Sequence, residues 1–306
     1  MGDAEVTPST DLQGRGAIVT GAGKGLGRAY ALHLAARGAK VLVNNRRHAG
    51  ESDAQTSAAQ TVAAIRAVGG VAEANWTDVN DPDGGIAMVQ QALANFGGLD
   101  IVVANAGVDQ PTAFHKQSLA DFRAIFDTSF FGNLHLAHAA WPHLLQQGYG
   151  RMVLTASSAG LHANHGQSAY SAAKAAVIGL MRALAIEGRR RDVRVNVIAP
   201  YGYSQMTAPY MDPAMADSFD PALVAPLVGW LCSPQCDVTG EVLVSGAGLV
   251  RRSGVGESDA SALRQGPISD VVHALQSKAL QAYPSANDSF ARFLQELATH
   301  SPEAAP

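Results

Sequence analysis

Short apolar segments alternate with longer segments of helical periodicity over most of this chain. The short segments are almost continuously apolar, which is typical of parallel strands that are buried on both faces of a sheet. The segments predicted to be strands are Ala17–Thr20, Val41–Asn44, Val71–Asn75, Ile101–Asn105, Met152–Thr155, Val193–Ile198 and Val242–Ser245.

The longer segments between them are predicted to be helices, and several are followed by glycine. They cover residues 26–37, 53–68, 83–96, 118–146, 168–188 and 221–232. Gly38, Gly69, Gly97, Gly148 and Gly188 are therefore predicted to end helices in the left-handed conformation. The alternation predicts an α/β fold. We expect a single Rossmann-type, doubly wound parallel sheet of about seven strands, with right-handed crossovers and helices on both faces.

The composition changes after about Leu249, where the chain becomes polar and rich in Ser and Ala. Two amphipathic helical pieces are predicted there, Val271–Ala282 and Phe290–Leu297. We therefore divide the chain into a main domain, residues 1–250, and a C-terminal extension, residues 251–306. The extension is expected to pack on the domain or on a neighbouring subunit.

Charge and composition exclude several classes of protein. The net charge is −4, so the basic face of a nucleic-acid-binding protein is not expected. Apolar residues make up 47% of the chain, enough for a large core. The only cysteines are Cys232 and Cys236, which indicates a reducing compartment, and we expect the cytoplasm. No window reads as a membrane span, and the first residues lack the apolar centre of a signal peptide.

The first chemical signal is the motif T-G-A-G-K-G-L-G, which follows the first predicted strand and opens a helix. Glycines in such a turn let the backbone approach a pyrophosphate, which the helix N-terminus also attracts. The alternative is a glycine-rich turn that binds no ligand. The predicted cofactor contacts in this motif are Gly21, Lys24, Gly25, Leu26 and Gly27.

The end of the second strand favours NADP(H) over NAD(H). A carboxylate at this place binds the ribose 2′-hydroxyl of NAD and repels a 2′-phosphate. This chain instead has Asn45, Arg46 and Arg47, with Lys24 in the glycine loop. Three cations suit a phosphate, which arginine can bind through two hydrogen bonds. The alternative is that both arginines are solvated and NAD(H) binds.

Residues after three further strands are predicted to complete the cofactor site. Asp78 and Val79 follow the third strand, where an adenine ring would lie. Small residues at the end of the fourth strand let backbone and cofactor meet closely. The remaining predicted contacts are Asn105, Ala106, Gly107, Pro200 and Gly202.

Tyr170 and Lys174 stand one helical turn apart, so they share a helix face, and Ser157 lies thirteen residues before the tyrosine. Hydride transfer to or from an alcohol carbon needs an acid/base at the oxygen. We expect a neighbouring Lys⁺ and an oxidised nicotinamide to lower the tyrosine pKa from about 10. The serine hydroxyl can bind the developing oxyanion. The alternative for a Tyr-x-x-x-Lys pair is an exposed helix face.

Taken together, these motifs resemble the short-chain dehydrogenase/reductase family over about residues 14–250. A-N-A-G, Y-S-A-A-K and the later V-N-V-I-A-P occur in the family's order. The resemblance implies that Tyr170 is the acid/base, that Lys174 tunes it and positions the ribose, and that Ser157 polarises the oxygen. The family commonly has asparagine where Ser129 stands. That asparagine helps to hold a water that links the lysine to solvent, and Ser129 is its candidate replacement.

Several stretches are more specifically similar to one subgroup, the (3R)-hydroxyacyl-CoA dehydrogenase unit of peroxisomal multifunctional enzyme type 2 and its bacterial relatives. They are Gly21–Ala31, Ala139–His143, Tyr149–Arg151, Leu184–Arg189, Ala225–Cys232 and Gly246–Gly248. The resemblance implies a (3R)-hydroxyacyl-CoA substrate, whose acyl part can be steroid-derived. The alternatives are a hydroxysteroid dehydrogenase, a 3-oxoacyl carrier-protein reductase, or a cofactor-binding redox sensor or scaffold without turnover.

The substrate is expected between the loop before Tyr170 and the long stretch after Pro200. The predicted pocket residues are His162, His165, Tyr201, Tyr203 and Met206. The stretch at residues 204–220 is a candidate lid, with ordinary surface packing as the alternative. We predict no metal site and no nucleic-acid or membrane partner. The family resemblance implies a homodimer or homotetramer formed through the helices at residues 118–146 and 168–188.

Overall fold

The computed structural model describes residues 10–263 and 267–300. These residues form two compact units, which meet in the sequence between Arg252 and Ser253. The first unit contains a sheet with the strand order β3-β2-β1-β4-β5-β6-β7-β8. The pairs from β3 to β7 are all parallel. The strands are β1 (Gly16–Val19), β2 (Lys40–Asn44), β3 (Val71–Asn75), β4 (Ile101–Ala104), β5 (Gly150–Thr155), β6 (Val193–Pro200), β7 (Val242–Gly246) and β8 (Leu249–Ser253).

The helices follow the predicted order. They are α1 (Gly25–Ala36), α2 (Ser57–Ala67), α3 (Gly84–Phe96), α4 (Leu119–Phe126), α5 (Gly132–Gln147), α6 (Ser158–His162), α7 (Ser168–Gly188), α8 (Ala225–Leu231), α9 (Ile268–Leu275) and α10 (Ala286–His300). Short 3-10 turns cover Asp53–Gln55, Phe114–Lys116, Arg189–Arg191, Ala208–Tyr210, Pro213–Met215 and Pro221–Leu223. A π turn, Asp127–Phe131, joins α4 to α5, so the predicted helix at 118–146 consists of three segments.

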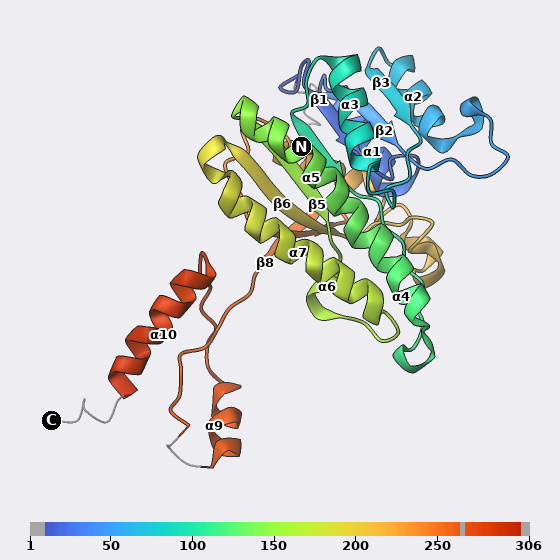
Figure 1. Cartoon of the computed structure of the whole chain (residues 1–306). Coiled ribbons are helices and arrows are strands. Elements are labelled where there is room, and N and C mark those ends of the chain that lie inside the picture. The colour runs from blue at the N-terminus through green and yellow to red at the C-terminus, as the bar shows by residue number, and fades with distance from the viewer. Residues whose placement is uncertain (1–9, 264–266, 301–306) are drawn as a thin grey trace, which may run out of the picture. The chain divides into compact units, whose positions relative to one another are not determined.

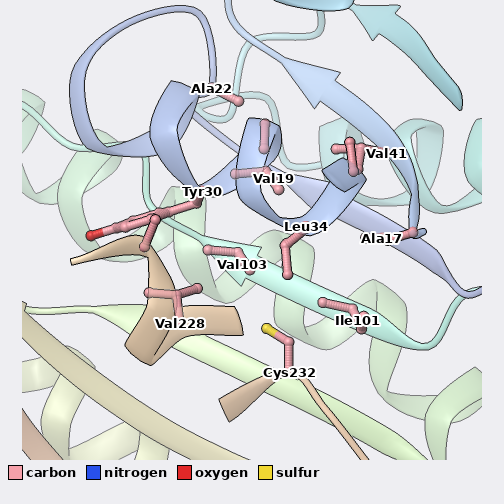
Figure 2. Close-up of a cluster of buried hydrophobic side chains, with 14 of the residues drawn as sticks. Ala17, Val19, Ala22, Tyr30, Leu34, Val41, Ile101, Val103, Val228 and Cys232 are labelled. Carbon is pink, nitrogen blue, oxygen red and sulfur yellow. The ribbon is translucent and has the colours of Figure 1, made fainter. Parts of the chain in front are cut away.

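Alternation along each strand divides the core between the two faces of the sheet. On one face, strand residues such as Ala17 and Val19 pack under α1, α2 and α8, as Figure 2 shows for Leu34 and Val228. On the other face, residues such as Ile18 pack under α3, α5 and α7, which lie in front of the sheet in Figure 1. The doubly wound Rossmann-type fold is therefore confirmed.

The eighth strand corrects the prediction of about seven. Ala247 and Gly248 both have positive φ, as two-residue hairpin turns require, and the chain reverses there into β8. Every residue of β8 is exposed or half-buried, and two of the five are arginines. An edge strand with this composition lacks the apolar run by which the other strands were recognised.

Four of the five predicted helix-ending glycines have positive φ, and Gly188 does not. The φ of Gly188 is −76°, and the helical path continues into Arg189–Arg191. A Cβ atom at Gly188 would lie 2.5 Å from the carbonyl oxygen of Val193 and 3.0 Å from the Trp141 ring. This glycine is therefore explained by close packing of α7 against β6 and α5, and not by a left-handed turn.

One described helical segment, Ser168–Arg191, is long and apolar enough to cross a membrane by length and composition. The sequence analysis predicted no segment with these properties. Half of it is buried inside the protein, and residues such as Val177 and Met181 pack in the core beside the sheet. The segment is therefore the central core helix of this unit, which explains its apolar composition.

The C-terminal unit has two helices whose bounds differ from those predicted. Helix α9 begins directly after Pro267 and ends at Leu275, seven residues before the predicted end. Within the unit, Arg292 pairs with Asp259 at 3.1 Å, and Lys278 donates to the Ser261 hydroxyl at 2.9 Å. An isolated antiparallel β-bridge pairs the backbones of Glu257 and Gln281.

Candidate active site

A cleft opens where the strand order reverses between β1 and β4, the place at which doubly wound sheets bind ligands. It consists of two adjoining pockets of about 280 and 310 Å³. The first lies over the ends of β2 and β3, and the second reaches Tyr170 on α7. The residues lining both are Gly21, Lys24, Asn45, Ala106, Gly107 and Gln205.

The glycine loop shapes the floor of this cleft. Gly21 and Gly25 have φ of +63° and +54°, a conformation that favours glycine. Lys24 caps α1 with extended backbone, so the helix N-terminus faces the cleft. A Cβ atom at Gly27 would lie 2.3 Å from the carbonyl oxygen of Gly21. The loop therefore needs glycine both for its turn and for its contact with α1.

We predict that Gly27→Ala weakens cofactor binding about tenfold or more, since the added methyl group must displace the loop backbone. Titration of cofactor fluorescence gives the affinity directly. Gly98→Ala is the matched control, because a Cβ atom added at Gly98 has open space around it and the φ of Gly98 is not positive. Equal affinities in both variants would contradict this role of Gly27.

The end of β2 presents cations to the first pocket, but not the three that the sequence suggested. Lys24 and Arg46 line it and form no ion pair within residues 10–263 and 267–300. Arg47 instead pairs with Asp53 and lies 4.8 Å from the centre of the Trp76 ring. Its guanidinium is occupied by these contacts, so Arg47 is not part of the pocket lining. His48, which was not predicted, does line the pocket.

Asn45 stands where a carboxylate would bind the ribose of NAD. Its amide donates to the Ser57 hydroxyl at 3.0 Å and lies against Gly23. It also lines both pockets. No Asp or Glu takes this place, so the end of β2 offers amide and cationic groups to a ligand.

The ends of β3 and β4 form the opposite wall. Asp78 and Val79 line the first pocket, and Asn105 lines the second. The Asn105 amide donates to the carbonyl oxygen of Thr20 at 3.1 Å, and its backbone N–H donates to the Thr20 hydroxyl at 3.0 Å. These bonds join the end of β4 to the start of the glycine loop.

Ser157, Tyr170 and Lys174 converge on the second pocket. Ser157 follows β5 and caps α6, where its hydroxyl accepts from the backbone N–H of Ala159 at 3.2 Å. Tyr170 and Lys174 share one face of α7, and the lysine nitrogen lies 5.7 Å from the centre of the tyrosine ring. That nitrogen is buried and donates to the carbonyl oxygen of Thr155 at 2.8 Å.

Burial dominates the protonation of this group. It raises the pKa of Tyr170 to about 12, a change that a hydrogen bond with Ser157 partly offsets and the Asp109 carboxylate increases. Burial also lowers the pKa of Lys174 to about 8. Desolvation of the phenol is therefore the largest influence on the Tyr170 pKa in this structure. The lowering that we expect from a neighbouring Lys⁺ and an oxidised nicotinamide stays a prediction.

Ser129 lies in the π turn between α4 and α5 and is fully buried. Its hydroxyl accepts from the N–H of Val108 at 3.0 Å and donates to the carbonyl oxygen of the same residue at 2.8 Å. A Cβ atom on Gly107 would lie 3.2 Å from the Lys174 nitrogen and 3.5 Å from the Ser129 oxygen. Ser129 thus lies near Lys174, and its contacts hold the loop after β4.

The predicted substrate residues are only partly brought together. Met206 lines the second pocket, as does Pro200, which was predicted as a cofactor contact. Gly202, the other cofactor contact predicted after β6, lines neither pocket, and its Cβ position lies 3.0 Å from Leu26 of the lining. His162 and His165 are exposed and line neither pocket. Tyr201 and Tyr203 also lie outside both linings. Residues 158–162 form helix α6, which ends at the exposed His162.

Sequence reasoning missed several polar residues that line the cleft. Thr77 and Thr128 have no motif of their own, and the stretch after Pro200 was read only as a lid. Its position over the glycine loop comes from packing, since the Ser204 Cβ lies 3.2 Å from the Cβ position of Gly25. The lining residues not predicted are Asn44, His48, Thr77, Val108, Thr128, Thr155, Ala156, Ser204, Gln205 and Thr207.

The cleft therefore fits a nicotinamide dinucleotide. Its glycine loop leaves room that side chains would fill, and a helix N-terminus faces it. Lys24 and Arg46 line the end where a ribose phosphate would lie, and Tyr170 lines the other pocket. Among the described residues, no group of three or more His, Cys, Asp or Glu side chains could hold a metal ion.

Comparison with known proteins agrees with this geometry. A family model described as short chain dehydrogenase matches residues 15–213. A short-chain type dehydrogenase/reductase of Mycobacterium tuberculosis is 40% identical over 243 residues, which are 79% of this chain and 85% of that protein. Mouse peroxisomal multifunctional enzyme type 2 is 41% identical over 241 residues, which are 78% of this chain but 32% of that longer enzyme.

Solved structures extend the similarity to the fold. The crystal structure of a short chain dehydrogenase from Mycobacterium avium matches with a TM-score of 0.76 and 35% identity. The match covers 89% of this chain and 98% of that one. With the glycine loop and the Ser157, Tyr170 and Lys174 set in one cleft, these matches show that the chain is an oxidoreductase of the short-chain dehydrogenase/reductase family.

Proposed function

We propose that this protein interconverts a (3R)-3-hydroxyacyl-CoA and its 3-oxo form, with NADP(H) as the favoured cofactor and NAD(H) as the alternative. The observation that carries the proposal is one cleft that joins Ser157, Tyr170 and Lys174 to a cationic ribose end. The acyl-CoA part rests on the similarity to the dehydrogenase unit of multifunctional enzyme type 2. A cytoplasmic homodimer or homotetramer remains part of this proposal.

When bound, the nicotinamide ring supplies or accepts the hydride. For reduction, the Tyr170 hydroxyl donates a proton to the substrate oxygen, and for oxidation the phenolate removes it. The Ser157 hydroxyl donates a hydrogen bond to the same oxygen while negative charge develops there. Lys174 is held by the Thr155 carbonyl oxygen below the tyrosine, where its charge favours the phenolate.

The wall of the second pocket suits an acyl chain. Met206 is 39% exposed, and Leu26 and Ala156 add apolar surface beside Tyr170. A thioether side chain adapts to substrates of different shape. A substrate with an apolar chain next to its alcohol carbon therefore fits this end of the cleft better than a small polyol does.

The test follows the absorbance of reduced nicotinamide with (3R)-3-hydroxyacyl-CoA esters of increasing chain length. The matched (3S) esters serve as the stereochemical control, and NADP⁺ and NAD⁺ are run in parallel. We expect turnover with the (3R) series and a higher kcat/KM with NADP⁺. Turnover of free hydroxysteroids or of 3-oxoacyl carrier protein, without turnover of the CoA esters, would overturn the substrate class but not the family.

A further inference from the structure

Asp109 is joined by a hydrogen bond to Gln167, at the start of the helix that carries Tyr170, although no family motif used above includes it. It lies five residues after the end of β4 and two residues after the Asn105-Ala106-Gly107 segment. Its Oδ2 atom accepts a hydrogen bond from the side-chain amide of Gln167, which stands three residues before Tyr170. Asp109 thus reaches across from the sheet to the start of α7.

This bond is one of several that join the loop after β4 to the segment before Tyr170. The backbone N–H of Thr112 donates to the carbonyl oxygen of Gly166 at 2.7 Å. The Ser168 hydroxyl donates to the Gln117 side chain at 3.3 Å. Gln167 is also held from its own side, because Asn164 donates to its Oε1 atom at 2.8 Å. The N-terminus of α7 is therefore anchored by the loop that carries Asp109.

The negative charge of Asp109 is not neutralised by a neighbouring cation. No Lys or Arg forms an ion pair with it in the part of the chain that the structure describes, and its Oδ1 atom is buried without a hydrogen-bond partner. Burial raises the pKa of this carboxyl, while hydrogen bonds from Gln167 and Gln110 lower it. At alkaline pH the carboxylate is ionised and acts on nearby groups through a medium poorer in water than the surface.

We infer that Asp109 is a positioning residue for Tyr170: it anchors the start of α7 through Gln167 and holds a negative charge near the phenol that favours the protonated form. The direction agrees with the effect of this carboxylate on the phenol, whose pKa it raises. Asp109 would thereby move the pH range of alcohol oxidation upward, in addition to the larger effect of burial, and it would favour a protonated tyrosine for reduction.

Other charged groups around Tyr170 are arranged differently. Lys174 lies on the same helix and Lys24 lines the same pocket, and both are cations. The elements packed against the start of α7 carry their charged and titratable side chains at the solvent-exposed surface, where water screens them. These side chains are Asp121 and Arg123 on α4, Asp127 on the π turn, His162 on α6, and His115 and Lys116 in the turn before Gln117. Asp109 thus differs from Asp121 and Asp127, because its carboxylate is partly buried and theirs are exposed to solvent.

The test uses three substitutions with different expected effects. Asp109→Asn keeps an oxygen that can accept from Gln167 but removes the charge. Gln167→Met removes the hydrogen bond and keeps the charge. Asp127→Asn removes an exposed charge from the neighbouring π turn and is the matched control.

Two readouts are recorded. One is the pH dependence of kcat/KM for alcohol oxidation, which rests on the proposed function. The other is the ¹³C NMR signal of ring-labelled tyrosine in the cofactor-free protein, with Tyr170→Phe assigning the resonance. The second needs no substrate, so failure of the proposed substrate would leave it interpretable.

In Asp109→Asn, we expect Tyr170 to ionise about 0.5–1 pH unit lower, with the acidic limb of the oxidation profile moved the same way. The sign follows because loss of a nearby anion makes the phenolate easier to form. Tyr170 should ionise at or above the wild-type pH in Gln167→Met, and at the wild-type pH in Asp127→Asn, because the charge of Asp127 is exposed to solvent. An unmoved titration in Asp109→Asn, or an equal downward shift in either other variant, would overturn the inference.

Discussion

Replacing Tyr170 by phenylalanine should lower kcat/KM by about 10²–10⁴-fold, the usual contribution of a positioned acid or base. The ring of Tyr170 packs with Ile125, Ala159 and Ala169, and phenylalanine preserves that packing. Only the hydroxyl that exchanges a proton with the substrate is lost. Cofactor affinity and the melting temperature should therefore stay close to the wild-type values.

The measurement combines steady-state rates with a cofactor titration on the same preparations. Tyr210→Phe is the matched control, since Tyr210 is 68% exposed and lines neither pocket. Full activity in Tyr170→Phe would remove the tyrosine from the reaction. If the wild-type protein bound the cofactor but turned over no alcohol or ketone, the alternative of a redox sensor or scaffold would gain support.

The second large effect is expected at the ribose end of the cleft. Arg46→Asp should reduce the ratio of NADP(H) to NAD(H) affinity by about 10- to 100-fold, the value of one or two charge-assisted hydrogen bonds. The new carboxylate would repel a 2′-phosphate and accept from a 2′-hydroxyl. The effect should be strong because Arg46 has no ion pair among the described residues that would hold it away from the pocket.

Arg47→Asp separates this local effect from a general change of charge. It makes the same change one residue later, at a side chain committed to Asp53 and Trp76. Fluorescence titrations with NADPH and NADH give the four affinities needed for each comparison. An equal change of the ratio in both variants would show that long-range charge, and not contact with Arg46, determines cofactor preference.

Much of the site was predictable because its signals are local in sequence. The glycines of the first loop and the four-residue spacing of Tyr170 and Lys174 are set by backbone conformation and helix periodicity. The buried strands were recognisable from their apolar runs, and the strands paired from β3 to β7 lie within a few residues of those expected. Each of these features needs only a short window of chain to be read.

Tertiary contacts decided the rest, because they bring together residues that are far apart in the sequence. Arg46 and Arg47 are adjacent arginines that the sequence cannot tell apart. Only the contacts of Arg47 with Asp53 and Trp76 hold it outside the pocket. Desolvation of Tyr170 depends on the helices around it, and Asp109 reaches Gln167 across 58 residues. The sequence by itself determined the fold class and the positions of the motifs. The tertiary structure decided which charges face the cleft, since burial and pairing depend on neighbours that no local pattern contains.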